Sequence, residues 1–464
     1  RDDVESRGLG DVYKRQEYNI EKLCFRYDSP YYRSAGETAD AVSLSELCEA
    51  LKKEIEIQGM SRLMFKIEQP LTEVLASMEH YGVGIDVGGV RKFGDSLVDE
   101  IGGLESQIYF MCGKEFNISS PKQLGEILHE MGVPLKKKTK TGYSTGAEIL
   151  EELRDSYPVI DLILRYRQLT KLNSTYVEGL LKTVAQDGRI HTSFRQTETR
   201  TGRISSTEPN LQNIPVRTEL GREMRKFFVA QDGRTLLDAD YSQIELRLVA
   251  HICADEAMIS GFADGADIHT STAARVFGLP EEMITPEMRS AAKAVNFGII
   301  YGIGAFSLSK DINVSVYEAK KYINDYLHKF PNVEKFMNET VEKAKKDGYV
   351  TTMFGRKRYV PELSASNKNM QAAGKRIAMN TPIQGSAADI IKIAMVRVYG
   401  RLKKEIPEAR LILQVHDELI VECSENDADR AAEILSEEMT HACELKVPLI
   451  ADVNRGGSWY DAKG

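Results

Sequence analysis

Residues 411–422 read LILQVHDELIVE and set His416, Asp417 and Glu418 between two aliphatic runs. The aliphatic residues alternate on both sides of the polar triplet, which is typical of a tight β-hairpin with Asp417 at its bend. A buried, unpaired carboxylate costs several kcal/mol or shifts its pKa until it is neutral. We therefore expect a compensating charge near Asp417, although the pattern also allows an ordinary surface turn.

A second aspartate follows a strand pattern at 236–251, LLDADYSQIELRLVAH. The apolar residues before Asp240 predict a short strand, and the periodicity after Ser242 predicts a helix. Carboxylates at strand ends are exposed to ligands on a rigid scaffold, although Asp240 could instead cap the helix. On adjacent strands, Asp240 and Asp417 can hold two hard divalent cations, as in phosphoryl transfer.

A polar stripe follows the predicted helix 288–302, MRSAAKAVNFGIIYG. Arg289, Lys293, Phe297 and Tyr301 recur every four residues and therefore share a face. Two cations, an aromatic ring and a phenol suit a nucleotide lying along the helix, with the cations on its phosphates and Phe297 stacked on its base. A solvated helix face is the alternative.

Two tracts are locally basic in a chain of net charge −8. Residues 195–228 read RQTETRTGRISSTEPNLQNIPVRTELGREMRKFF, and positions 189–226 hold eight Arg or Lys against four Asp or Glu. This composition predicts a surface that binds phosphates and minor-groove acceptors. The tract PLKKKTKTGYSTG at 134–146 predicts either a solvated loop or a DNA-binding tip that grips phosphate through Lys136, Lys137 and Lys138.

The composition is that of a globular protein with several subdomains. Of 464 residues, 42% are hydrophobic and 28% are charged. The six cysteines lack the spacing of a zinc site or disulfide framework. No apolar stretch approaches the roughly 20 residues that span a bilayer, so we predict a cytoplasmic protein without a membrane partner. Strand-like runs flank a helical block from about 242 to 405, which predicts a mixed sheet interrupted by a helical insertion.

Three of these segments resemble the polymerase motifs of family A DNA polymerases, the bacterial DNA polymerase I type. They are DYSQIELR at 240, RSAAKAVNFGIIYG at 289 and QVHDE at 414. Further similar blocks follow in the family's order, TGRISSTEPNLQNIPVR at 201, DIHTSTAARVFG at 267 and RIAMNTPIQGSAADIIK at 376, while NISSPKQLGEIL and TGYSTGAEIL resemble its thumb. The resemblance implies an α+β right-hand fold, in which a palm with an antiparallel sheet carries helical fingers and a helical thumb.

The resemblance also implies how the chain is divided. Residues 1–16 are expected to be a non-native leader, 17–60 a remnant of a 3′–5′ exonuclease domain, 61–188 the thumb and supporting helices, 189–241 the first part of the palm, 242–370 the fingers, and 371–464 the second part of the palm with the 411–422 hairpin. We therefore expect neither proofreading nor 5′ nuclease activity from this chain.

Site residues are carried over by the same resemblance. It implies that Asp240, Asp417 and the backbone carbonyl of Tyr241 bind two Mg²⁺ ions, for which Mn²⁺ can substitute, with Glu418 nearby as a further catalytic residue. Lys293 is implied as the proton donor to pyrophosphate and Glu245 as the residue that excludes a 2′-hydroxyl. The implied dNTP contacts are Arg289, Lys293, Phe297, Tyr301, His269, Glu245 and Gln243, and the implied DNA contacts are Arg203, Asn210, Gln212, Asn213, Arg376, Gln384 and His416.

The residues and the resemblance together predict a template-directed DNA polymerase. It would add dNTPs to a primer 3′-hydroxyl with release of pyrophosphate, as a monomer acting in replication and repair at the bacterial nucleoid. A single-subunit RNA polymerase has similar motifs, but Glu245 and Phe297 argue against it. A two-metal nuclease needs no triphosphate clamp such as the 289–301 stripe, and a catalytically silent DNA-binding module needs no paired carboxylates.

Overall fold

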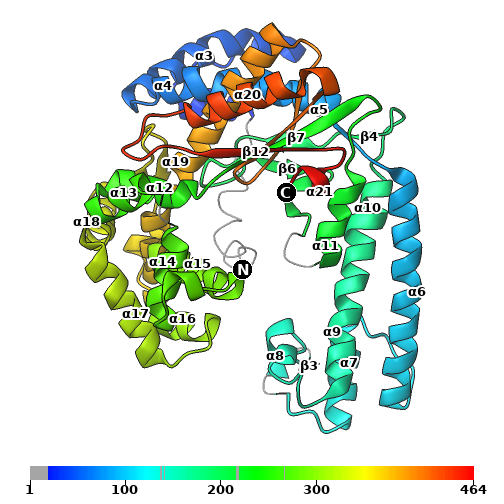
Figure 1. Cartoon of the computed structure of the whole chain (residues 1–464). Helices are drawn as coiled ribbons and strands as arrows, with labels where there is room; N and C mark the ends of the chain where they lie inside the picture. The colour runs from blue at the N-terminus through cyan, green and yellow to red at the C-terminus, as the bar shows by residue number, and fades with distance from the viewer. Residues whose placement is uncertain (1–18, 136–137, 140–141, 216–218, 266, 464) are drawn as a thin grey trace.

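Two helical arms extend from the same side of a central sheet (Figure 1). The computed structural model describes residues 19–135, 138–139, 142–215, 219–265 and 267–463. One arm is built from residues 87–181 and the other from residues 256–329. Within the described part of the chain, no helix is long and apolar enough to cross a membrane.

The central sheet has four antiparallel strands. They are β7 (Arg234–Tyr241), β10 (Arg410–Val415), β11 (Glu418–Ser424) and β12 (Ala451–Gly456), in the order β10-β11-β7-β12. Our prediction of a mixed sheet was therefore wrong, and the antiparallel palm sheet implied by the resemblance is confirmed. A two-residue turn joins β10 to β11, which only an antiparallel pair allows, and β11 and β12 both run opposite to β7.

The two arms are almost entirely helical. The first contains α6 (Val87–Cys112), α7 (Pro121–Glu130), α8 (Ala147–Glu151), α9 (Pro158–Lys171) and α10 (Glu178–Leu181). The second contains α13 (Glu256–Ala263), α14 (Ile268–Phe277), α15 (Pro286–Ile300), α16 (Ala305–Asp311) and α17 (Val316–Lys329). Local capping marks their starts: Asp86 caps α6, Thr285 caps α15 ahead of Pro286, and Ser315 forms a capping box with α17.

Other helices support the sheet. They are α2 (Ile20–Arg26), α3 (Ala39–Ile57), α4 (Ser61–Leu63), α5 (Gln69–Tyr81), α11 (Glu219–Glu223), α12 (Ile244–Cys253), α18 (Pro331–Asp347), α19 (Lys368–Glu405), α20 (Ala428–Thr440) and α21 (Trp459–Ala462). The long helix α19 contacts α5, α12, α18, α20 and β10, and α20 packs on β7 and β12. One face of the sheet is thereby covered by helices, as is common for antiparallel sheets.

A short hairpin interrupts the helical block that we predicted from 242 to 405. It consists of β8 (Tyr349–Thr351) and β9 (Lys357–Tyr359) and lies between α18 and α19. Gly348 ends α18 at a φ of +78°, and Gly355 turns the hairpin at a φ of +85°. Glycine adopts this left-handed backbone without steric cost, which explains the break. The remaining pairs are β1 (Val83–Gly84) with β4 (Arg189–Ile190), β2 (Lys138–Thr139) with β3 (Gly142–Tyr143), and β5 (Ser193–Arg195) with β6 (Ser205–Thr207).

Candidate active site

The turn between β10 and β11 brings Asp417 beside Asp240. Glu418 lies directly opposite Asp240 in the β11–β7 register, and the backbone N–H of Tyr241 donates to the carbonyl oxygen of Asp417 at 3.1 Å. The predicted hairpin with Asp417 at its bend is confirmed. The two alternatives were wrong, because the turn abuts β7 and because α12 begins after Gln243 without a side-chain cap.

Backbone strain accompanies both aspartates. His416, directly before Asp417, has a φ of +51°. Gln243, three residues after Asp240, has a φ of +54°. A non-glycine residue in this left-handed region is unusual and persists only where the surroundings impose it. The strained turns therefore mark the meeting point of β7 and the hairpin as a built site.

The Asp417 carboxylate has no hydrogen-bond or ion-pair partner among the residues that the structure describes. Burial raises the pKa of Asp417, Arg203 lowers it, and the nearby charge of Asp240 raises it further. The Asp240 side chain is 45% exposed, and one of its oxygens lies 2.9 Å from Nζ of Lys463. Oxygens on both aspartates thus remain open to a cation.

Glu418 is held differently, although it neighbours Asp417. Nε1 of Trp459 donates to one carboxylate oxygen at 2.6 Å, and Nζ of Lys463 donates to the other at 2.7 Å. Burial opposes its ionisation, but a hydrogen bond from Asp238 and the charges of Lys463 and Arg225 hold the pKa of Glu418 below its ordinary value. Both Glu418 oxygens already have donors, so Asp240 and Asp417 are better placed to bind a metal directly.

Our sequence analysis missed two charged residues beside Asp240 and Glu418, namely Asp238 and Lys463. Asp238 is 2% exposed, and Lys463 lies within 4 Å of Asp238, Asp240 and Glu418. Asp238 carried a signal, because residues two apart on a strand share a face and it precedes Asp240 by two positions. Lys463 carried none, since nothing in the sequence near it points to a strand more than 200 residues earlier.

Asp238→Asn should gain stability relative to the parent protein as the pH rises from about 5 to about 9. Burial and Glu418 raise the pKa of Asp238 to about 9, far above that of an unfolded aspartate. The folded parent therefore retains a proton that the unfolded chain has lost, and its stability falls with pH by at most about 1.4 kcal/mol per unit. Asparagine cannot ionise and retains a donor toward Glu418.

The measurement is the difference in Tm between this variant and the parent at several pH values. Asp452→Asn is the matched control, because it removes an exposed carboxylate that lies opposite Asp240 on β12. A difference between Asp238→Asn and the parent that stays constant with pH would contradict the raised pKa.

The predicted polar stripe lies on α15, as the spacing indicated. Arg289 forms an ion pair with Asp267 at the start of α14. The rings of Phe297 and Tyr301 are stacked with centroids 5.9 Å apart, and the Phe297 ring is 5.7 Å from that of His269. Lys293 is exposed and has no ion-pair partner within the described part of the chain. The alternative of a purely solvated face was wrong, because the aromatic end of the stripe is partly buried.

His269 was expected to contact the triphosphate, for which a positively charged ring would be favourable, but the ring is uncharged in this structure. It is 1% exposed, and burial lowers its pKa to about 4, so the ring is neutral at physiological pH. Asn296 accepts a hydrogen bond from Thr272 through its carbonyl oxygen, which turns its amide N–H toward Nδ1 of His269 at 2.9 Å. The ring proton then resides on Nε2, which lacks a partner among the described residues. His269 can offer an uncharged N–H donor there.

Glu245 connects the helical arm to the sheet. One carboxylate oxygen lies 2.8 Å from the Arg203 guanidinium, and the other accepts a hydrogen bond from the Tyr301 hydroxyl. Burial raises the pKa of Glu245 to about 7, although Arg203 opposes the shift. A side chain at the start of α12 thus ties the end of α15 to the loop that carries Arg203.

The predicted DNA contacts form part of the surroundings of the turn. The Gln212 amide donates to the carbonyl oxygen of Gln414 at 3.2 Å, which ties its loop to β10. The Asn210 side chain caps the same loop, and the Asn213 carbonyl accepts a hydrogen bond from Tyr176 at 2.6 Å. The half-buried side chains of Arg376 and Gln384 lie on α19, and His416 is exposed.

The basic surface is smaller than predicted. Arg189 is buried in an ion pair with Glu422, and Arg225 is buried with its guanidinium 3.9 Å from the Trp459 ring centroid. These two arginines compensate buried carboxylates of the sheet and do not reach solvent. The tip lysines cannot be placed on a surface: Lys136 and Lys137 lie outside the described residues, and Lys138 is described only as part of the backbone of β2.

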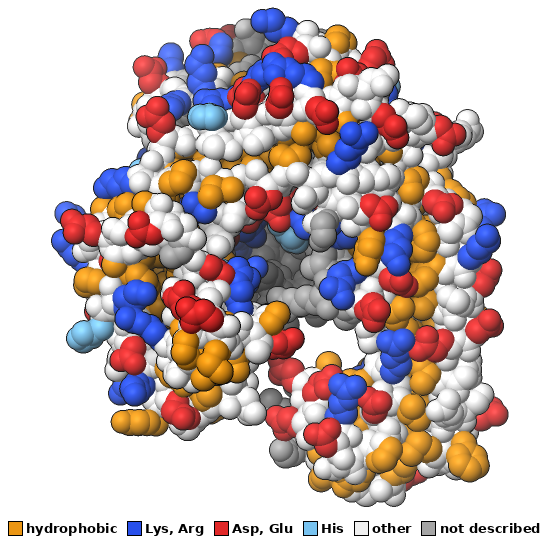
Figure 2. All heavy atoms as spheres, in the orientation of Figure 1, with side chains coloured by type: hydrophobic (Ala, Val, Ile, Leu, Met, Phe, Trp, Pro, Cys, Tyr) orange, Lys and Arg blue, Asp and Glu red, His pale blue; other side chains and the backbone are white. Residues whose placement is uncertain are grey.

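The molecule is hollowed between its two arms. Figure 2 shows this hollow below the sheet, with Lys and Arg side chains on both of its flanks and acidic side chains above it. Within the described ranges, no group of three or more His, Cys, Asp and Glu side chains has the geometry of a metal site. The oxygen donors available at the turn are therefore the two aspartates and backbone carbonyls.

Comparisons with known proteins agree with this architecture. DNA polymerase I of Caldicellulosiruptor bescii is 46% identical over 454 residues, which are 97% of this chain and 53% of the relative. DNA polymerase I of Geobacillus stearothermophilus is 48% identical over 426 residues, which are 91% of this chain and 49% of the relative. The chain thus spans about half the length of these curated relatives.

A solved structure is similar over nearly the whole chain. The POL domain of Pol1 from M. smegmatis, in complex with DNA primer-template and dNTP, superposes with a TM-score of 0.91 at 41% identity, covering 97% of this chain and 80% of that one. The family model described as DNA polymerase family A matches residues 89–461, which contain both aspartates, the α15 stripe, the second arm and all but the first two residues of the first arm. The chain therefore belongs to DNA polymerase family A.

Proposed function

We propose that this chain catalyses template-directed DNA synthesis by transferring the α-phosphate of a dNTP to a primer 3′-hydroxyl. One observation carries the proposal: Asp240 and Asp417 meet at one end of the sheet, while the cationic and aromatic stripe of α15 is tied to the same place through Tyr301 and Glu245. The similarity to a polymerase domain bound to primer-template and dNTP supports it.

The domain assignment is part of the proposal. Residues 189–241 and 371–464, with the central sheet, would be the palm. Residues 61–188, with the arm from α6 to α10, would be the thumb and its supporting helices, and residues 242–370, with the arm from α13 to α17, would be the fingers. Residues 17–60 would correspond to the end of an exonuclease domain. The chain would act as a monomer in the cytoplasm, on primer-template DNA of the nucleoid; the relatives are DNA polymerase I proteins of bacteria.

Members of this family generally use divalent metal ions, and the donor set at the turn fits Mg²⁺. Asp240 and Asp417 provide hard oxygen ligands that lack donors on at least one oxygen each, and the Tyr241 carbonyl is adjacent. We infer that these groups hold two Mg²⁺ ions, which Mn²⁺ can replace. Such ions, when bound, activate the primer hydroxyl and neutralise charge on the leaving group.

The chain's own side chains would hold and select the nucleotide. Arg289 and Lys293 would bind the triphosphate, with Lys293 giving a proton to the leaving pyrophosphate and His269 donating one uncharged N–H. Phe297 would contact the base and sugar, and Tyr301 would guard the template position. Gln243 lies at the start of α12, and its side-chain oxygen is buried without a partner among the described residues, so it would be available to the nucleotide.

Glu245 and the surface around the turn would provide specificity. Both carboxylate oxygens of Glu245 have partners, Arg203 and Tyr301, so the side chain would be held in place against a ribose 2′-hydroxyl. This argues against the RNA polymerase alternative. The residues proposed to hold primer and template are Arg203, Asn210, Gln212, Asn213, Arg376, Gln384 and His416.

Primer extension tests the proposal. A labelled primer on a longer template should be extended with dNTPs and Mg²⁺, and chelation of the metal by EDTA should abolish extension. A primer with a mismatched 3′ end, run in parallel, reports whether the chain trims the end before it extends it. Shortening of the primer without dNTPs would favour the two-metal nuclease, and preferential use of rNTPs would favour the RNA polymerase.

A further inference from the structure

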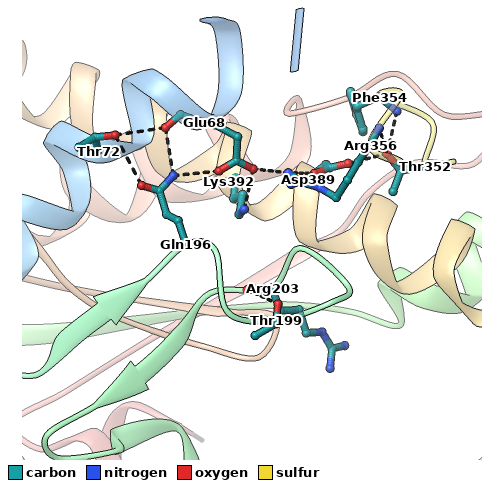
Figure 3. Close-up of polar contacts among 10 residues, drawn as sticks. All are labelled: Glu68, Thr72, Gln196, Thr199, Arg203, Thr352, Phe354, Arg356, Asp389 and Lys392. Carbon is teal, nitrogen blue, oxygen red and sulfur yellow. Dashed lines mark hydrogen bonds and ion pairs between the residues drawn. The ribbon is translucent and has the colours of Figure 1, made fainter. Parts of the chain in front are cut away.

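A buried ionic cluster lies next to the loop that carries Arg203 (Figure 3). It consists of Glu68, Arg356, Asp389 and Lys392, and none of these residues takes part in the chemistry proposed above. The side chains of Asp389 and Lys392 are fully buried, and those of Glu68 and Arg356 are 15% and 17% exposed. The members come from three segments that are distant in the sequence. Glu68 ends the π-helical turn Met64–Glu68 that leads into α5, Arg356 lies in the β8–β9 hairpin, and Asp389 and Lys392 lie on α19.

Direct contacts join the cluster into one unit. Nζ of Lys392 lies 2.7 Å from a carboxylate oxygen of Glu68. The guanidinium of Arg356 lies 2.6 Å from Asp389 and also pairs with Glu68. The Thr352 hydroxyl donates to the second oxygen of Asp389 at 2.7 Å. Two buried cations are therefore balanced by two buried carboxylates.

Stability alone is a poor reason for such a cluster. Replacing a buried ion pair by apolar residues of similar volume is often neutral or stabilising, because removing charges from water is costly. Burial lowers the pKa of Lys392 even though Glu68 raises it, which reflects this cost. A cluster kept under these conditions is more readily explained by the position that it imposes on its neighbours.

The neighbour in contact with Arg356 is the loop that leads to Arg203. Gly202 has a φ of +84°, and a Cβ atom added to it would lie 2.5 Å from Nε of Arg356. Nε2 of Gln196 donates to Glu68 at 2.9 Å, and the Thr199 hydroxyl donates to the Arg203 carbonyl. The cluster therefore contacts the loop at two places, at Gln196 through Glu68 (Figure 3) and at Gly202 through Arg356.

Arg203 connects this loop to the site. Its guanidinium is paired with Glu245 and favours the ionised form of Asp417. A cavity of about 40 Å³ is lined by Lys392 as well as by Arg203 and Asp417. This small space therefore borders both the cluster and the catalytic turn.

We propose that the Arg356–Asp389 pair of this cluster is a positioning device: Arg356, held in place by Asp389, sets the 199–203 loop and thereby the Arg203–Glu245 pair that selects the nucleotide sugar. This inference rests on the proposed function, because it relies on the role assigned to Glu245. It adds two positioning residues, Arg356 and Asp389, that lie outside the groups assigned to substrate and metal.

Two matched double variants test the role. Arg356→Met with Asp389→Asn removes one buried cation and one buried anion, together with the guanidinium that packs on Gly202. Glu68→Gln with Lys392→Met also removes one of each charge, but it keeps Arg356 on Gly202 and keeps Asp389 as its partner. Neither pair leaves an uncompensated charge, so both variants should fold.

The readout is the ratio of kcat/KM for dNTP to that for the matching rNTP on one primed template. We expect the Arg356 variant to lose roughly tenfold to a hundredfold in this ratio, as is typical of small misplacements in a site. The Glu68 and Lys392 variant should keep the parental ratio. Amide hydrogen exchange over residues 199–203 should accelerate only in the Arg356 variant, and this second readout does not depend on catalysis.

Gly202→Ala supplies a coupling test, because its Cβ would displace the loop from Arg356. It should lower the ratio in the parent but add little in the Arg356 variant, since both changes act through one contact. If the Arg356 variant is poorly folded, Arg356→Lys replaces it, with a smaller effect in the same direction. Parental ratios and exchange rates in the Arg356 variant, or equal losses in both double variants, would overturn the inference. A parent protein that extends no primer would instead refute the proposed function.

Discussion

Asp417→Ala should reduce the rate of primer extension by about a thousandfold or more. The variant loses the half-buried carboxylate that has no partner among the described residues and that we assign to metal binding. Stabilisation of the transition state by a bound metal is worth several kcal/mol, and each 1.4 kcal/mol is about a factor of ten in rate. The measurement is single-turnover extension by one nucleotide at saturating dNTP and Mg²⁺.

The same variant should not be less stable than the parent at neutral pH. Burial raises the pKa of Asp417, so its ionised form is disfavoured in the folded protein, and removing it relieves that cost. Asp429→Ala, on the exposed side of α20, is the control for loss of one carboxylate and should extend primers at the parental rate. Undiminished extension by Asp417→Ala would refute the metal-site assignment.

Lys293→Ala should lower kcat on the order of 10² to 10⁴-fold, the usual contribution of a positioned proton donor. Lys293 is exposed on the face of α15 between Arg289 and Phe297 and has no ion-pair partner in the described part of the chain. Its ammonium group is therefore available to the leaving pyrophosphate. The measurement is the dNTP dependence of single-nucleotide insertion, which separates kcat from KM.

Arg289→Ala offers the informative comparison on the same helix. Its guanidinium is shared with Asp267, and it would bind the triphosphate in ground state and transition state alike, so its loss should mainly raise KM. Lys320→Ala, an exposed lysine on α17, controls for loss of positive charge on this arm. An unchanged kcat in Lys293→Ala would remove the proton-donor assignment and leave Lys293 as a phosphate contact.

Much of the site was predictable because its residues carry local patterns. Alternation in LILQVHDELIVE predicted the β10–β11 hairpin with Asp417 at the bend, and four-residue spacing predicted the α15 stripe. Both patterns indicate the side of a strand or helix on which a side chain lies. That side depends only on the local backbone, so residues close in the sequence suffice to predict it. The resemblance to family A then brought Asp240 and Asp417 together across 177 positions, and the β11–β7 register agrees with it.

Other features depended on contacts that no local pattern encodes. The prediction of a mixed sheet was wrong because the direction of each strand is set by the path of the chain that connects it to its neighbours. Arg189 and Arg225 were expected at a basic surface, yet they compensate buried Glu422 and Glu418. The β8–β9 hairpin, which supplies Arg356, was hidden in a block that we took to be helical throughout.

The amino-acid order alone therefore determines the hairpin and the helix that carry the predicted site residues, the family, and the choice of the two aspartates, because these follow from periodicity and motif. The packed chain decides which charges neutralise one another. The carboxylate of Glu418 is bonded to Trp459 and Lys463, and that of Glu245 to Tyr301 and Arg203. The carboxylate of Asp417 has no partner among the described residues. A buried carboxylate must be protonated, paired or bound to a cation, and the partner that meets it is fixed by three-dimensional distance, not by separation along the chain.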